Sequence, residues 1–277
     1  MENIKLIADS GSTQCDWIVS ENDDIIYQTD GINPFYQTAD EIFKIISELL
    51  SNNNLQHITS VHFYGAGCSF PEKKETVKEA LSRCLPEADI EIESDLLAAA
   101  RGLCGKEPGI ACILGTGSNS CFYNGTVIKE NIPPLGYILG DEGSGAVIGR
   151  IFIGNLLKKQ YPDYLYKNFM DYYGTSPQEI MDCVYKKPFP NRYLGQFTKF
   201  IAENIKDSCL YDLVFDAFVS FINRNIIHYD YLSYPTYFTG SIAFHFEDIL
   251  RDACLTHGIW PAGITQSPLM GLMEYHR

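Results

Sequence analysis

Two turns rich in Gly, Ser and Thr have the composition and spacing that suit phosphate chemistry. The first turn ends the segment Ile4–Thr13 (IKLIADSGST), and the second ends the segment Ile110–Asn119 (IACILGTGSN). In both segments a short apolar run precedes the turn. Small residues leave backbone N–H groups accessible to a polyphosphate, and glycine lets a ligand approach the backbone closely. The repeat therefore predicts two related halves that grip a nucleotide in a cleft between two domains.

Three aspartates near such turns are candidates for further chemistry. Asp9 ends the first apolar run, where a buried carboxylate is costly unless a cation such as Mg²⁺ or hydrogen-bond donors compensate it. Asp95 precedes an Ala-rich run, where it could cap a helix or act as the general base that accepts the proton of an attacking hydroxyl. Asp141 lies among the glycines of Gly140–Gly145 and is a candidate contact for sugar hydroxyls. Gly115 matches Asp9 in the second turn, so the two turns differ in chemistry.

The elements expected to position these residues alternate between strands and helices, which is typical of an α/β domain on a mixed sheet. After the first strand we expect a hairpin with strands at Trp17–Ser20 and Ile25–Thr29, helices at Asp40–Leu50, Pro71–Leu85 and Leu96–Cys104, and strands at Ser60–Tyr64 and Asp89–Glu93. Glu91 and Glu93 alternate along the last of these strands and are expected to face solvent.

The second half repeats the strand and hairpin and then becomes mostly helical. Asn124-Gly125 is a strong two-residue turn signal between strands at Cys121–Tyr123 and Thr126–Lys129. Tyr234–Thr239 is predicted to be the final strand, and Pro268–Tyr275 a short closing helix. We place the domain boundary near residue 109, giving domains at 1–109 and 110–264, with the segment 265–277 expected to pack back on the first domain.

Composition and charge exclude several classes of protein. The chain has 277 residues, enough for two domains with real cores, and a net charge of −14, which argues against nucleic-acid and anionic-membrane partners. It shows neither a signal peptide nor an apolar run long enough to span a membrane. Its nine cysteines include no CxxC pair and are expected to be reduced core thiols. We expect a cytoplasmic protein, and we also consider a homodimer.

The motifs together resemble the superfamily of sugar kinases, actin and heat-shock ATPases. DSGST matches its first phosphate loop, GTGS its second and GSIAF its adenosine loop, over nearly the whole chain. GTGSNS followed by GYILGDEGSGAVIGR is more specific, and is similar to the N-acetylglucosamine kinases and the wider BadF/BadG/BcrA/BcrD ATPase-like family. The resemblance implies two ribonuclease H-like domains, each a mixed five-stranded sheet with flanking helices, with the active-site cleft between them.

The same resemblance implies a role for each matching residue. Asp9 would organise Mg²⁺, and Asp95 would be the general base. The ATP-binding residues would be Ser10, Gly11, Ser12, Thr13, Gly115, Thr116, Gly117, Ser118, Gly240 and Ser241. The sugar-binding residues would be Asn33, Gly65, Ala66, Gly67, Ser118, Asn119 and Asp141.

The implied activity is ATP-dependent phosphorylation of an amino sugar, most simply N-acetylglucosamine at its 6-hydroxyl. Two departures concern its details: Gln14 stands where many relatives carry Lys or Arg, and Leu135 where the mammalian-type kinases place a Trp near the sugar. Two other functions stay open. The chain could be an activator ATPase that holds an iron–sulfur cluster between two subunits, or a sensor that binds nucleotide or sugar without turnover.

Overall fold

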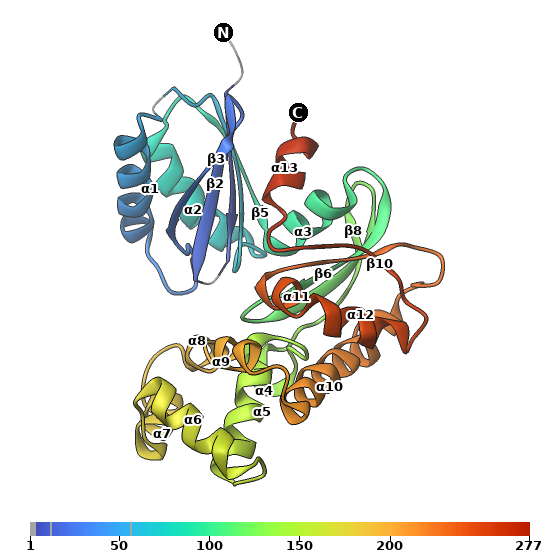
Figure 1. The fold of residues 1–277 in the computed structure, drawn as a ribbon. Helices are drawn as coiled ribbons and strands as arrows, with labels where there is room; N and C mark the ends of the chain where they lie inside the picture. Colours follow the sequence, from blue (N-terminus) through green and yellow to red (C-terminus); the bar gives the residue numbers. More distant parts are fainter. Residues whose placement is uncertain (1–3, 12, 56) are drawn as a thin grey trace. The chain divides into compact units, whose positions relative to one another are not determined.

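The structure is a computed structural model that describes residues 4–11, 13–55 and 57–277. The chain divides into two compact units, coloured along the sequence in Figure 1. Unit 1 comprises Met1–Glu107, Asn124–Ile128 and Ser267–Arg277, and unit 2 comprises Pro108–Tyr123 and Lys129–Gln266. The chain thus leaves unit 1 after Glu107 and ends in it.

Unit 1 is built on a five-stranded mixed sheet with the strand order β3-β2-β1-β4-β5. The strands are β1 (Lys5–Ser10), β2 (Gln14–Val19), β3 (Asn22–Asp30), β4 (Ser60–Gly65) and β5 (Asp89–Ser94). Both pairs of the β1–β2–β3 meander are antiparallel, whereas β1, β4 and β5 run parallel to one another. The predicted strands are confirmed, except that the first hairpin turn is tighter than expected, because Val19 already pairs with Asn22.

Helices cover both faces of this sheet. Successive residues of a strand point to opposite faces, so Leu6 and Ala8 of β1 join one buried cluster and Ile7 joins another. The first cluster lies under α1 (Ala39–Asn53) and α2 (Pro71–Cys84), and the second under α3 (Asp95–Cys104) and α13 (Leu269–Tyr275). All three predicted helices of the first half and the closing helix are therefore confirmed.

Two glycines let α13 cross α3 at very close range. A Cβ added to Gly271 would lie 1.8 Å from the carbonyl oxygen of Gly102, and one added to Gly102 would lie 2.6 Å from that of Pro268. Neither backbone carbonyl can move aside without shifting its helix. The C-terminal segment thus depends on glycine at both positions.

We expect Gly271→Ala to destabilise unit 1 by about 3 kcal/mol or more, since the methyl group must push the two helices apart. Gly154→Ala is the matched control: Gly154 is also helical, but has open space around its Cβ position. The control should be neutral or stabilised by about 0.5–1 kcal/mol. Urea unfolding followed by circular dichroism measures both, and equal midpoints for the two variants would contradict the prediction.

Unit 2 contains the second five-stranded sheet, in the order β10-β9-β6-β7-β8. Its strands are β6 (Pro108–Leu114), β7 (Ser118–Asn124), β8 (Ile128–Ile132), β9 (Thr236–Thr239) and β10 (Pro261–Thr265). Tyr234–Thr239 is therefore not the final strand, since β10 follows it and pairs with β9 in parallel. The hairpin turn is also longer than the predicted two residues, because β8 begins only at Ile128.

The remainder of unit 2 is mostly helical, as predicted. Its helices are α4 (Gly136–Leu139), α5 (Gly145–Leu157), α6 (Asp163–Tyr173), α7 (Pro177–Tyr185), α8 (Pro190–Gly195), α9 (Thr198–Glu203), α10 (Ser208–Arg224), η1 (Ile226–His228), α11 (Ser241–His245) and α12 (Glu247–Leu255). One large buried cluster, in which Phe152, Phe169 and Phe218 are fully buried, unites these helices with the sheet. Two mixed five-stranded sheets with flanking helices confirm the expected fold class.

Candidate active site

The carboxyl ends of three parallel strands bring the predicted residues of unit 1 to one edge of its sheet. Ser10 of β1 is level with Gly65 of β4, which is level with Ser94 of β5. Asp9, in β1, and Asp95, directly after β5, therefore lie at the same edge, and these two strands are about 10 Å apart. Open α/β sheets place their ligands at this edge.

Asp95 is the first residue of α3, and its neighbour caps the helix. The Ser94 hydroxyl accepts a hydrogen bond from the Leu97 amide, whereas Asp95 Oδ1 accepts one from the Leu96 amide at 2.9 Å. Burial raises the pKa of Asp95 above its usual value, despite the bonds from nearby backbone amides. A carboxylate that is fixed through one oxygen and made more basic is suited to accept a proton.

Asp9 is the second buried carboxylate of this edge with a raised pKa. Burial, followed by repulsion from Asp95 and Asp16, raises its pKa to about 7. The Ser267 hydroxyl, just before α13, donates a hydrogen bond to Asp9 Oδ2 at 3.3 Å. A Mg²⁺ ion would relieve both the burial cost and the repulsion, so the donor set fits such an ion. Ser267 was not predicted, and only the fold reveals its contact.

The first phosphate turn uses some of its polar groups for its own structure. The Gly11 amide donates to the Gln14 carbonyl at 3.0 Å, and the buried Ser10 hydroxyl donates to the Ile32 carbonyl and accepts from the Ile32 amide. These groups shape the turn, so the predicted phosphate contacts fall to other groups, such as the Thr13 amide. The predicted residue Ser12 lies outside the described residues.

Asn33 and the loop Gly65-Ala66-Gly67 are adjacent, as a shared sugar subsite requires. Asn33 is only 8% exposed, and its Oδ1 accepts a hydrogen bond from the Phe35 amide at 3.0 Å. A Cβ on Gly67, whose φ is +86°, would lie 2.6 Å from that Oδ1. The Ala66 amide donates to the Ser10 carbonyl. Because Asn33 Oδ1 already accepts the bond from the Phe35 amide, Nδ2 is the side-chain group of Asn33 that can donate to a ligand.

The second phosphate turn in unit 2 closes in a similar way. The Gly115 amide donates to the Gly117 carbonyl at 2.9 Å, which resembles the bond that closes the first turn. The Gly145 and Ala146 amides, at the start of α5, donate to the carbonyls of Gly115 and Thr116. The glycine-rich loop before α5 is thereby fixed to the turn.

Gly240 follows β9, which runs parallel to β6, and lies against the second turn. Its φ is +112°, and a Cβ there would lie 2.4 Å from the Leu114 carbonyl oxygen. Ser241 begins α11 directly after it. The predicted adenosine residues and the second phosphate turn therefore lie at the same edge of the unit 2 sheet.

The Asp141 carboxylate faces the second turn, whereas the Asn119 side chain makes its hydrogen bonds within the sheet. Burial raises the pKa of Asp141 to about 6, although a hydrogen bond from the Ser118 amide lowers it. A Cβ on Gly117 would lie 3.1 Å from Asp141 Oδ2. Asn119 Oδ1 accepts from the Ser120 amide and from Asn131 Nδ2. Of the sugar contacts predicted in unit 2, Asp141 thus lies beside the second turn, whereas the Asn119 side-chain oxygen is bonded within the sheet.

We expect Asp141→Asn to stabilise the ligand-free protein at pH 7.5 but not at pH 4. A carboxyl group with a raised pKa stabilises the fold while protonated, and loses that stabilisation as the pH rises through about 6. Asparagine tolerates the positive φ of 52° at this position and stays neutral. At pH 7.5 we expect the free energy of unfolding to rise by about 1 kcal/mol, after allowance for the partial exposure of the side chain. Thermal unfolding at both pH values measures it, and equal shifts at the two would contradict the prediction.

Comparisons with known proteins identify the family. No family model and no curated protein matches the chain. A solved structure from Porphyromonas gingivalis, described as that of a candidate N-acetylglucosamine kinase, is 47% identical, with a TM-score of 0.93 over 98% of each chain. The chain belongs to the N-acetylglucosamine kinase family. This family, of the BadF/BadG/BcrA/BcrD ATPase-like type, is one of sugar kinases, and the chain is a carbohydrate kinase.

Two more distant structures share the fold. A candidate N-acetylglucosamine kinase from Chromobacterium violaceum is 16% identical over 99% of each chain, with a TM-score of 0.73. A ROK family glucokinase from Streptomyces griseus, solved with glucose and AMPPNP, is 13% identical over 98% of each chain, with a TM-score of 0.61. The two-domain sugar-kinase fold predicted from the motifs is thus confirmed. Among the described residues no helix is long and apolar enough to cross a membrane.

The two departures from the family pattern have distinct surroundings in this family member. Gln14 lies at the start of β2, and its Nε2 donates to Asp16 Oδ1 at 2.7 Å. Leu135 is 60% exposed and adopts a φ of +62°, which is uncommon for a leucine. Gln14 therefore orients an acidic neighbour of Asp9, whereas Leu135 is a strained and exposed apolar residue.

Proposed function

We propose that this kinase transfers the γ-phosphoryl group of ATP to the 6-hydroxyl of an N-acetylated amino sugar, with N-acetylglucosamine as the preferred acceptor. Asp95 accepts the hydroxyl proton as the sugar oxygen forms a bond to the γ-phosphorus. The bond between that phosphorus and the bridging oxygen breaks, and ADP leaves. Asp9 would hold Mg²⁺, which when bound neutralises charge on the phosphates.

The observation that carries this proposal is the pair of desolvated aspartates at one sheet edge. Repulsion from Asp95 is the second largest cause of the raised pKa of Asp9, so the two carboxylates interact electrostatically. Such pairs are typical of sites where one carboxylate binds a cation and the other handles a proton. The 47% identity to a candidate N-acetylglucosamine kinase supports the choice of acceptor.

The remaining predicted residues take proposed roles in unit 1 or in unit 2. Asn33 donates through Nδ2 to the sugar, beside the Gly65–Gly67 loop, and Asp141 accepts hydrogen bonds from sugar hydroxyls. Thr13 and Gly115–Ser118 hold the ATP phosphates, and Gly240 with Ser241 lies against the adenosine. A cytoplasmic location and a homodimer remain proposals.

The cysteines do not favour the iron–sulfur activator as an alternative. Burial raises the pKa of Cys68, Cys104 and Cys254 to about 12, and it also raises that of Cys15 well above its usual value. Cluster ligation needs thiolates, which such thiols do not readily supply near neutral pH. The sensor alternative predicts binding without turnover, so an activity assay separates it from the kinase.

The test is an assay of ADP release with ATP, Mg²⁺ and a panel of acceptors: N-acetylglucosamine, N-acetylmannosamine, N-acetylmuramic acid, glucosamine, glucose and no sugar. We expect turnover that depends on an N-acetyl sugar and is highest with N-acetylglucosamine. Coupling between phosphorus and the C6 protons in the NMR spectrum of the product would establish the position. Turnover that is equal with and without sugar, or absent with every acceptor, would overturn the proposal.

A further inference from the structure

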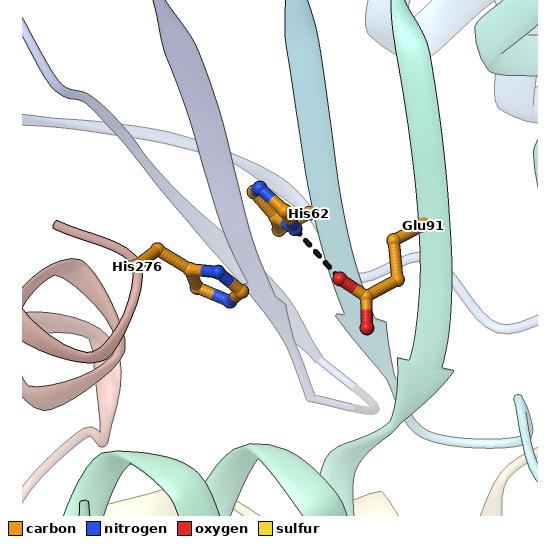
Figure 2. Close-up of side chains that lie close together, drawn as sticks. All are labelled: His62, Glu91 and His276. Atoms are coloured by element: carbon orange, nitrogen blue, oxygen red, sulfur yellow. Dashed lines mark hydrogen bonds and ion pairs between the residues drawn. The ribbon is translucent and has the colours of Figure 1, made fainter.

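Three potential metal ligands meet in unit 1 away from the edge that carries the two aspartates. His62 lies on β4, Glu91 on β5 and His276 just after α13 (Figure 2). His62 and Glu91 are paired in the sheet register, and His62 Nδ1 lies 2.8 Å from Glu91 Oε2. The His276 ring stacks on that of His62, with ring centres 3.7 Å apart. Residues from distant parts of the sequence thus meet on one face of the sheet.

The donor set and its spacing suit a transition-metal ion. One ligand atom from each of His62, Glu91 and His276 lies within 4.8 Å of the others. In a tetrahedral zinc site with bonds of about 2.1 Å, neighbouring ligand atoms are about 3.4 Å apart. To bind one ion, the three donors must move closer together, and the stacked rings of His62 and His276 must turn so that one ring nitrogen of each points to the ion. Two imidazoles and one carboxylate are a ligand set that zinc uses where a fourth position is left to water.

Neighbouring groups already orient the donors. Tyr64 Oη lies 2.8 Å from His276 Nε2, which leaves His276 Nδ1 for an ion. Arg101 donates to Glu91 Oε1 at 2.9 Å and to Tyr64 Oη at 2.7 Å, so Glu91 Oε2 is the oxygen for an ion once its bond to His62 Nδ1 opens. Metal-binding histidines generally use their second nitrogen in such a bond, and bound carboxylates are held similarly. The surroundings thus resemble the outer shell of a metal site.

The surroundings of His276 and Glu91 also set the charges of these two side chains. Burial and the nearby His62 lower the pKa of His276 to about 4, so its imidazole is neutral at pH 7. The hydrogen bonds from His62 and Arg101 lower the pKa of Glu91 to about 2, so its carboxylate is charged. Glu91 was expected to face solvent; its side chain is 38% exposed, and its oxygens also bond to His62 and Arg101.

We propose that His62, Glu91 and His276 bind one divalent transition-metal ion of the Zn²⁺ class, with water as the fourth ligand. The ion joins two strands to the residue that follows α13 and so fastens the C-terminal segment to the sheet. The same segment begins at Ser267, whose hydroxyl contacts Asp9. The site is distinct from the Mg²⁺ position proposed at Asp9, because it uses imidazole ligands, which Mg²⁺ does not favour.

The test is a calorimetric titration of metal-stripped full-length protein with ZnCl₂ in excess Mg²⁺. We expect one tight equivalent for the wild type and its loss in His276→Gln and in Glu91→Gln. His57→Gln is the matched control, since His57 also pairs with a glutamate, Glu21, but on the surface. The control should bind as the wild type does. Equal binding by all four proteins, or no binding by the wild type, would overturn the proposal.

Two further measurements keep the result independent of folding defects and of the cysteines. Tyr64→Phe removes a group that orients His276 but keeps all three ligands, so we expect Zn²⁺ affinity to fall about tenfold. The Co²⁺-loaded wild type should show the visible absorption of a tetrahedral site without a thiolate charge-transfer band. A strong thiolate band, or unchanged affinity in Tyr64→Phe, would place the ion elsewhere and overturn the proposal.

Discussion

Asp95→Asn is expected to lower kcat by about 10²- to 10⁴-fold with ATP and the preferred sugar, with little change in KM. Asparagine has the same shape and can still accept the Leu96 amide through Oδ1, while Ser94 continues to cap α3. It cannot take a proton from the sugar hydroxyl. Because burial raises the pKa of Asp95, loss of its charge should leave the melting temperature unchanged or raise it. Steady-state kinetics and thermal unfolding together separate loss of the base from loss of the fold.

The control for this variant is Asp163→Asn. Asp163 also begins a helix, α6, but lies far along the chain from the predicted site residues and is exposed. Its replacement should leave kcat unchanged, which would show that loss of a helix-start carboxylate is not itself harmful. Full activity in Asp95→Asn would contradict the role of Asp95 as base.

The sequence predicts the parts of this fold that are local in the chain. The strand before Asp9, the helix after Ser94 and the Gly115 turn each combine a clear apolar pattern with a turn or cap signal, and each is present in the structure. The repeat of the strand and turn predicted two related halves, and the resemblance to the sugar-kinase superfamily implied the two five-stranded sheets. The shared edge of Asp9 and Asp95 was not predicted, and the structure shows it in the parallel order of β1, β4 and β5.

The features that sequence reasoning missed depend on contacts between distant residues. β10 contains Pro261 and Gly263, which weaken the pattern of a strand, and β10 is stabilised by its pairing with β9. Ser267 before Pro268 reads as an ordinary turn, yet its hydroxyl contacts Asp9 from across the sequence. Likewise, nothing in the segment around Glu91 indicates that His276 lies beside it.

Asp9→Asn is the second variant with a large expected effect. We expect phosphoryl transfer to fall by about 10²-fold or more and the Mg²⁺ concentration for half-maximal rate to rise, since a neutral amide is a weaker ligand for a divalent cation than a carboxylate. The ligand-free fold should not suffer, because the buried charge and its repulsion from Asp95 and Asp16 are removed. Initial rates over a range of Mg²⁺ concentrations, with ATP held in excess, measure the effect.

Ser267→Ala gives the comparison that assigns this effect to the carboxylate rather than to its surroundings. The substitution removes the hydroxyl that contacts Asp9 Oδ2 and that accepts the Leu269 amide at the start of α13, but it leaves the charge in place. We expect a smaller loss of rate with an unchanged Mg²⁺ requirement, because the ion still meets a carboxylate. A Mg²⁺ dependence in Asp9→Asn equal to that of the wild type would contradict the proposed role of Asp9. A shifted dependence in Ser267→Ala would instead show that the ion's position depends on the C-terminal segment that holds this serine.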